Sequence, residues 1–87
     1  MKIKKEMILR EIAGENILVP GANAVLELNG LFVVTETGAF IWKNLTLVES
    51  EEELVEKMLD EYEIGKETAE KDIAEFLNKL RDFGIID

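Results

Sequence analysis

The side chains of this 87-residue sequence that could take part in chemistry are almost all carboxylates and the cations of Lys and Arg. Histidine and cysteine are absent, and Ser50 is the only serine. The sequence therefore lacks the commonest general base near neutral pH, thiolate nucleophiles, disulfides and most zinc ligands. Glycine-rich phosphate-binding motifs are missing too. We predict that the protein is not an enzyme and that it has no cofactor or metal site.

The densest group of acids runs from Glu49 to Glu53 and could be imagined as a site for a hard cation. It lacks the alternating Asp or Asn ligands and the turn glycine of a calcium-binding loop. Ser50, followed three residues later by Glu53, forms a capping box, in which the hydroxyl accepts the Glu53 amide and the Glu53 carboxylate reaches back. Acids are also favourable at the positive end of a helix dipole. We interpret the run as the start of a helix.

The charge of the sequence is unevenly distributed. The 19 acids and 10 bases give a net charge of −9, and residues 49–87, with 14 of the acids and five of the bases, carry all of that excess. Nucleic acid and anionic lipid attract Lys and Arg, so neither is an expected partner. No signal-peptide apolar region follows the charged start, and the apolar runs are far shorter than the ~20 residues that a membrane helix needs. We expect a cytoplasmic protein that does not associate with a membrane.

The pattern of the first half of the sequence predicts strands and turns. Short runs rich in β-branched residues at Met7–Ala13 and Asn16–Pro20 flank Gly14-Glu15, which indicates a hairpin. A second hairpin is predicted where Val25–Leu28 and Leu31–Val34 flank an Asn-Gly pair, because both central residues of a type I′ turn need a positive φ.

The pattern of the second half predicts three helices. Thr35 can cap the first, a short helix with apolar side chains nearly all round, which we expect to be buried between other elements. Ser50 begins the second helix, and the third begins near Gly65-Lys66. Gly84 supplies the left-handed residue that ends the third helix, after which Ile85 can fold back. The apolar stripe of the third helix consists of Ala69, Ile73, Phe76, Leu77, Leu80 and Phe83.

A length of 87 residues, without a Gly-, Ser- or Pro-rich linker between the halves, predicts a single domain over residues 1–87. Its expected fold is α+β and winged-helix-like: a small antiparallel N-terminal sheet of three to four strands, followed by three helices. Such a fold serves either as a DNA reader or as a platform for another protein, and the fold alone does not choose between them. The predicted third helix has more acids than bases. If it entered a groove of DNA, the phosphates would therefore repel it. A winged-helix DNA-binding regulator is the alternative function.

Six segments together carry a family resemblance. They are Val34–Trp42, Leu54–Tyr62, Asp72–Leu80 and Phe83–Ile86, with Leu9–Glu15 and Val19–Gly21 upstream. In this order they resemble the coenzyme PQQ synthesis protein D (PqqD) family over nearly the whole chain. The resemblance implies a module without an active site that binds the leader of a ribosomally made precursor peptide. It also implies a partner that receives the peptide, a radical S-adenosylmethionine (SAM) enzyme or another modifying enzyme, in the PQQ pathway or in another.

In proteins of that family the leader adds as a strand to a sheet edge and packs into a cleft beside the third helix. We hypothesise that Leu31–Val34 is the docking edge, with Val25–Leu28 as the substitute if the strand order differs. A sheet edge also permits strand exchange, so we expect a monomer or a strand-swapped dimer. An apolar stripe at helical spacing is equally typical of a core, and both interpretations stay open. The candidate peptide-binding residues are Leu31, Phe32, Val33, Val34, Ile73, Phe76, Lys79, Leu80 and Phe83.

Overall fold

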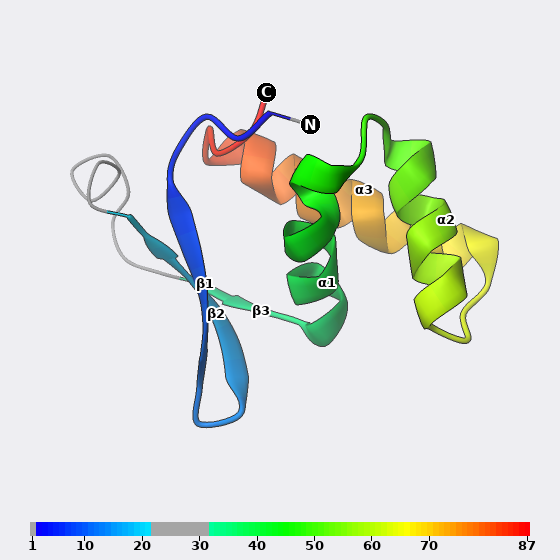
Figure 1. The fold of residues 1–87 in the computed structure, drawn as a ribbon, viewed down its shortest axis with the longest axis horizontal. Helices are drawn as coiled ribbons and strands as arrows, with labels where there is room; N and C mark the ends of the chain where they lie inside the picture. The colour runs from blue at the N-terminus through cyan, green and yellow to red at the C-terminus, as the bar shows by residue number, and fades with distance from the viewer. Residues whose placement is uncertain (1, 22–31) are drawn as a thin grey trace.

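The structure is a computed structural model that describes residues 2–21 and 32–87. The described residues form an antiparallel sheet beside a group of helices (Figure 1), which confirms the predicted α+β fold and is compatible with the winged-helix comparison. The predicted strand Val25–Leu28 and its Asn-Gly turn lie outside the described residues, as does Leu31. In chain order the elements are β1 (Met7–Ile12), β2 (Glu15–Pro20), β3 (Phe32–Val34), α1 (Glu36–Asn44), a 3-10 turn η1 (Leu45–Leu47), α2 (Glu51–Glu61) and α3 (Lys66–Asp82).

The β1–β2 hairpin turns through Ala13 and Gly14, whose φ angles are 53° and 81°. Two successive positive φ values define the tight turn that suits the right-handed twist of a hairpin. Ile12 pairs with Glu15, so the turn lies one residue earlier than the predicted Gly14-Glu15. The sequence pattern misplaced it because alanine seldom adopts a positive φ, whereas glycine does so readily.

The sheet has the order β1-β2-β3 among the described strands, so β2 is central and β3 lies at an edge. Side chains alternate between the two faces of a strand. Leu18 of β2 and Val34 of β3 point to the helices and are 0% and 7% exposed, whereas Ile12 and Val33 lie on the other face and are 52% and 54% exposed. The core therefore lies between the inner face of the sheet and the helices.

The helix starts agree with the predicted caps. The Gly38 N–H donates to the Thr35 hydroxyl over 3.0 Å at the start of α1, and the Glu53 N–H donates to the Ser50 hydroxyl over 3.3 Å at the start of α2. The Glu53 carboxylate reaches back one residue further than in the standard box, because it accepts from the Glu49 N–H over 3.4 Å. The acid run is thus a helix start.

The chain leaves α3 through Gly84, which has a φ of 70°. This turn lets Ile85 fold back as predicted: its N–H donates to the Leu80 carbonyl over 2.8 Å, and its side chain is fully buried. Ile86 then pairs with Ile3 in an isolated antiparallel bridge, so the two ends of the described chain lie side by side (Figure 1).

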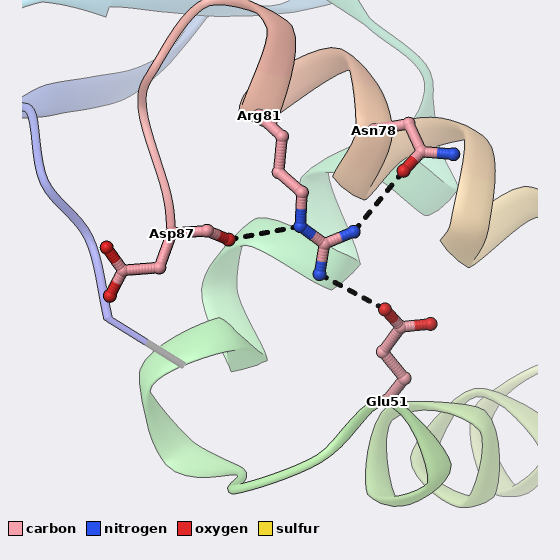
Figure 2. Close-up of polar contacts among 4 residues, drawn as sticks. All are labelled: Glu51, Asn78, Arg81 and Asp87. Carbon is pink, nitrogen blue, oxygen red and sulfur yellow. Dashed lines mark hydrogen bonds and ion pairs between the residues drawn. The ribbon is translucent and has the colours of Figure 1, made fainter.

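Arg81, near the end of α3, links three parts of the chain (Figure 2). Its guanidinium donates to the Asp87 carbonyl over 3.0 Å, to the Asn78 side-chain oxygen over 3.3 Å and to the Glu51 carboxylate over 3.2 Å. The side chains of Arg81 and Glu51 are 38% and 45% exposed, so water and salt screen the ion pair. The contact therefore holds the start of α2 beside the end of α3, but it adds little to the free energy of unfolding.

The burial pattern leads to a stability prediction. Leu18→Ala should lower the free energy of unfolding by about 2–5 kcal/mol, because it leaves a cavity at the centre of the core. Ile12→Ala removes a similar aliphatic side chain from the same sheet at an exposed position and should cost about 0.5 kcal/mol or less. Urea unfolding followed by circular dichroism measures both values. Equal losses in the two variants would contradict the assignment of faces to the sheet.

Candidate functional site

The hydrogen-bond pattern of the sheet determines which backbone groups β3 presents outward. The Gly21 N–H donates to the Glu6 carbonyl over 2.8 Å, one step beyond the Met7–Pro20 pair. Hydrogen-bonded and non-bonded pairs alternate along an antiparallel ladder. Gly21 bonds toward β1, so the odd-numbered residues of β2 also turn their backbone N–H and C=O toward β1. The even-numbered residues of β2 turn theirs toward β3.

The same alternation continues into β3. Phe32 and Val34 lie opposite Leu18 and Asn16, so their backbone groups bond to β2. Val33 lies opposite Ile17, and its N–H and C=O therefore point away from the sheet. No strand in the described part of the chain pairs with this outer side of β3. A donor and an acceptor are thus available there to an added strand.

A groove of about 340 Å³ lies beside this edge. One wall comes from β3, a second from the first turns of α1 and a third from the middle of α3. The groove combines apolar side chains with hydroxyls and charges, and the exposed Val33 is part of its lining. Its lining residues are Val33, Val34, Thr35, Thr37, Gly38, Ile41, Asp72, Glu75, Phe76 and Lys79.

Gly38 lets the ring of Phe76 lie close to α1. A Cβ atom placed on Gly38 would be 3.2 Å from Cε1 and 3.3 Å from Cδ1 of Phe76, and 3.3 Å from the Thr35 hydroxyl. These distances are shorter than ordinary van der Waals contacts, so the ring or the helix would have to shift. The half-buried Phe76 ring can thus lie this close to α1 in the groove because residue 38 has no side chain.

The structure brings four of the nine candidate residues to the groove: Val33, Val34, Phe76 and Lys79. Phe32 belongs to the same strand. Ile73 and Leu80 are 1% and 0% exposed, and they pack into the core behind the groove. Phe83 is 44% exposed at the end of α3 and does not line the groove.

Six residues that line the groove were missing from the sequence-based set. Asp72 and Glu75 could have been found, because they lie four residues before Phe76 and Lys79 and so share their side of a helix. Gly38 carries a weaker signal, since a glycine inside a helix usually has a packing reason. The other three, Thr35, Thr37 and Ile41, follow from the position of α1 and not from a motif.

A second hollow, of about 270 Å³, lies between the β1–β2 hairpin, α1 and the end of α2. Its aromatic side chains are Phe40 and Tyr62, whose ring centroids are 5.4 Å apart in an edge-to-face arrangement. Burial raises the pKa of the Tyr62 phenol, and the nearby carboxylates of Glu36 and Glu61 raise it further. The phenol therefore stays protonated at neutral pH and does not act as a base.

Two further observations bear on the class of the protein. Among the described residues no three His, Cys, Asp or Glu side chains converge where they could hold a metal ion. None of the described helices combines the length and the apolar character that crossing a membrane requires.

Comparisons with known proteins place the chain in a defined group. The model of the family described as coenzyme PQQ synthesis protein D (PqqD) matches residues 17–86. A solved structure entitled "TbiB1 in Complex with the TbiA(beta) Leader Peptide" is similar with a TM-score of 0.73 and 25% identity, over 100% of this chain and 95% of that one. Another, entitled "Lasso peptide synthetase B1 complexed with the leader peptide", has a TM-score of 0.72 and 21% identity, over 97% and 93% of the two chains. The second likeness concerns the fold alone. No curated protein matches the sequence.

The contact between Gly38 and Phe76 can be tested directly. Gly38→Ala should shift the NMR resonances of the Phe76 ring, because the new methyl group displaces the ring by a few tenths of an ångström. The replacement also favours the helix by up to about 1 kcal/mol, so we expect the protein to stay folded. Gly65→Ala is the matched control, since a Cβ there meets nothing within 4 Å. An unchanged Phe76 ring in Gly38→Ala would show that this wall of the groove is placed wrongly.

Proposed function

The chain belongs to the PqqD family, and from that membership and the geometry of β3 we propose that it is a peptide-recognition element without catalytic activity. It binds the leader of a ribosomally made precursor peptide and presents that peptide to a modifying enzyme. One observation carries the proposal: the outward N–H and C=O belong to Val33, a residue that also lines a groove of about 340 Å³.

Such binding is β-augmentation. The leader adds as a strand outside β3, where its backbone bonds to Val33 regardless of sequence, and every second side chain enters the groove. Phe32, Val33 and Val34 then form the strand side of the site, and Phe76 and Lys79 form the helix side. Phe83 lies one helical turn beyond Lys79, where the leader leaves the groove. The buried Ile73 and Leu80 support the wall from behind, and the candidate Leu31 precedes Phe32 in the sequence, outside the described residues.

The comparisons support this proposal through the two similar structures. The structure that is 25% identical is entitled as a complex with a leader peptide and matches the whole of this chain, and the other structure agrees with it in fold. The residue inventory supports the non-catalytic part, because His, Cys and a free serine are missing and the Ser50 hydroxyl accepts the Glu53 amide. A radical SAM enzyme or another peptide-modifying enzyme is the receiving partner. The cytoplasm is the place of action, since ribosomal precursors are made there.

No observation favours the alternative of a DNA-binding regulator. The helix α3 would have to enter a groove lined by phosphates, yet its central turns carry more acids than bases. Its apolar side chains Ile73, Leu77 and Leu80 are committed to the core.

The proposal is tested with synthetic peptides that correspond to the N-terminal segments of short reading frames beside the gene. At least one should bind, and it should protect the amide of Val33 from hydrogen exchange, because that N–H becomes bonded to the added strand. NMR shifts should follow β3 and the α3 side of the groove. Shifts confined to the start of α2 around Glu49–Glu53 would refute the site.

A substitution at the edge gives the complementary prediction. Val33→Pro removes the outward N–H and should weaken binding of such a peptide by roughly tenfold or more, since one hydrogen bond is lost and its acceptor is left without a donor. The fold should survive, because proline is tolerated on the open side of an edge strand. Val33→Ala keeps the N–H and is the control; isothermal titration calorimetry measures both affinities. Equal affinities in the two variants would show that the backbone of Val33 does not bind the peptide.

A further inference from the structure

The groove beside β3 contains two carboxylates that form no ion pair within the described residues. Asp72 and Glu75 both line it from α3. In residues 2–21 and 32–87 no hydrogen bond or ion pair involves either side chain. Asp72 is half-buried, so water screens its charge less than that of a fully exposed acid. A cation brought into the groove would therefore find two partners already positioned there.

The spacing along α3 sets these acids against the apolar part of the groove. Asp72, Glu75, Phe76 and Lys79 follow one another at intervals that keep them on one side of the helix. Asp72 and Phe76 are separated by four residues, roughly 6 Å along the helix axis. Two residues of an extended strand cover roughly 6.6 Å, which is nearly the same distance. A strand in the groove thus places successive inward side chains at these two positions.

The relative direction of β3 and α3 determines which end of the groove is acidic. Figure 1 shows β3 and α3 running in opposite directions. Asp72 precedes Phe76 in α3, so the acids lie toward the end of the groove where Val34 leads into α1. Lys79 lies toward the other end.

We propose that Asp72 and Glu75 select a leader that carries Lys or Arg two positions away from the apolar residue that covers Phe76. This inference rests on the proposed function and specifies the peptide class that the site accepts. A leader antiparallel to β3 has the order base, any residue, apolar residue, and a parallel leader has the reverse order. Each carboxylate accepts a charge-assisted hydrogen bond from the cation. The net negative charge of the protein would favour a base at any position of the leader. The proposed selection differs, because it requires a base at one particular position.

The test uses a displayed library of random peptides, selected separately against the whole wild-type protein and two double variants. Asp72→Asn with Glu75→Gln removes the charges in the groove. Glu67→Gln with Glu70→Gln is the control: it removes two negative charges from the same helix at positions that do not line this groove. Circular dichroism verifies that all three proteins are folded. Affinities of the selected peptides are then measured at low and high salt.

We expect wild type and control to enrich a base two positions from an apolar residue, and the groove variant to lose that enrichment. Selected peptides should bind the groove variant about fivefold more weakly than the control, and high salt should reduce the difference. The inference would be overturned if the groove variant kept the enrichment, or if the control lost it to the same extent. Either result would leave the proposed peptide binding intact. A wild-type protein that selects no peptide at all would overturn the proposed function, and this inference with it.

Discussion

The site depends on one constraint, which is that β2 hydrogen-bonds on both of its sides. A strand in the middle of a sheet forces its two neighbours to the edges. Here β1 enters from the hairpin, so β3 takes the remaining edge directly before α1. The antiparallel alternation then determines that Val33, and neither of its neighbours, presents its backbone groups outward.

The groove has its shape because packing behind it is complete. Leu18, Ile73 and Leu80 are at most 1% exposed, so the helices cannot move closer to the sheet without overpacking. The hollow remains at the surface, where Gly38 provides room for the Phe76 ring. Core packing and groove lining are therefore divided between neighbouring side chains of one helix: Ile73 and Leu80 face the core, while Phe76 and Lys79 face the groove.

The features that could be predicted from the sequence are those fixed by local interactions. The caps at Thr35 and Ser50 and the left-handed Gly84 depend on a few adjacent residues, and each was found in place. The hairpin turn was misplaced by one residue because Ala13 adopts a positive φ, which follows from the register of the β1–β2 pairing and not from the residue type. The apolar periodicity of α3 could not separate core from groove, since Ile73 and Phe76 lie on one stripe. Which side of that stripe meets the sheet is decided by residues far away in the chain.

The brevity of the open edge has a kinetic consequence. Along β3, Val33 alone offers an outward donor and acceptor, and two such bonds contribute only about 1–3 kcal/mol together. That is less than the ~4 kcal/mol of even a millimolar complex. Most of the residence time of a bound strand must then come from side chains in the groove, and a segment with poorly matched side chains dissociates quickly. Under the proposed function, such a module would bind many peptides only briefly and would retain those whose side chains fit the groove.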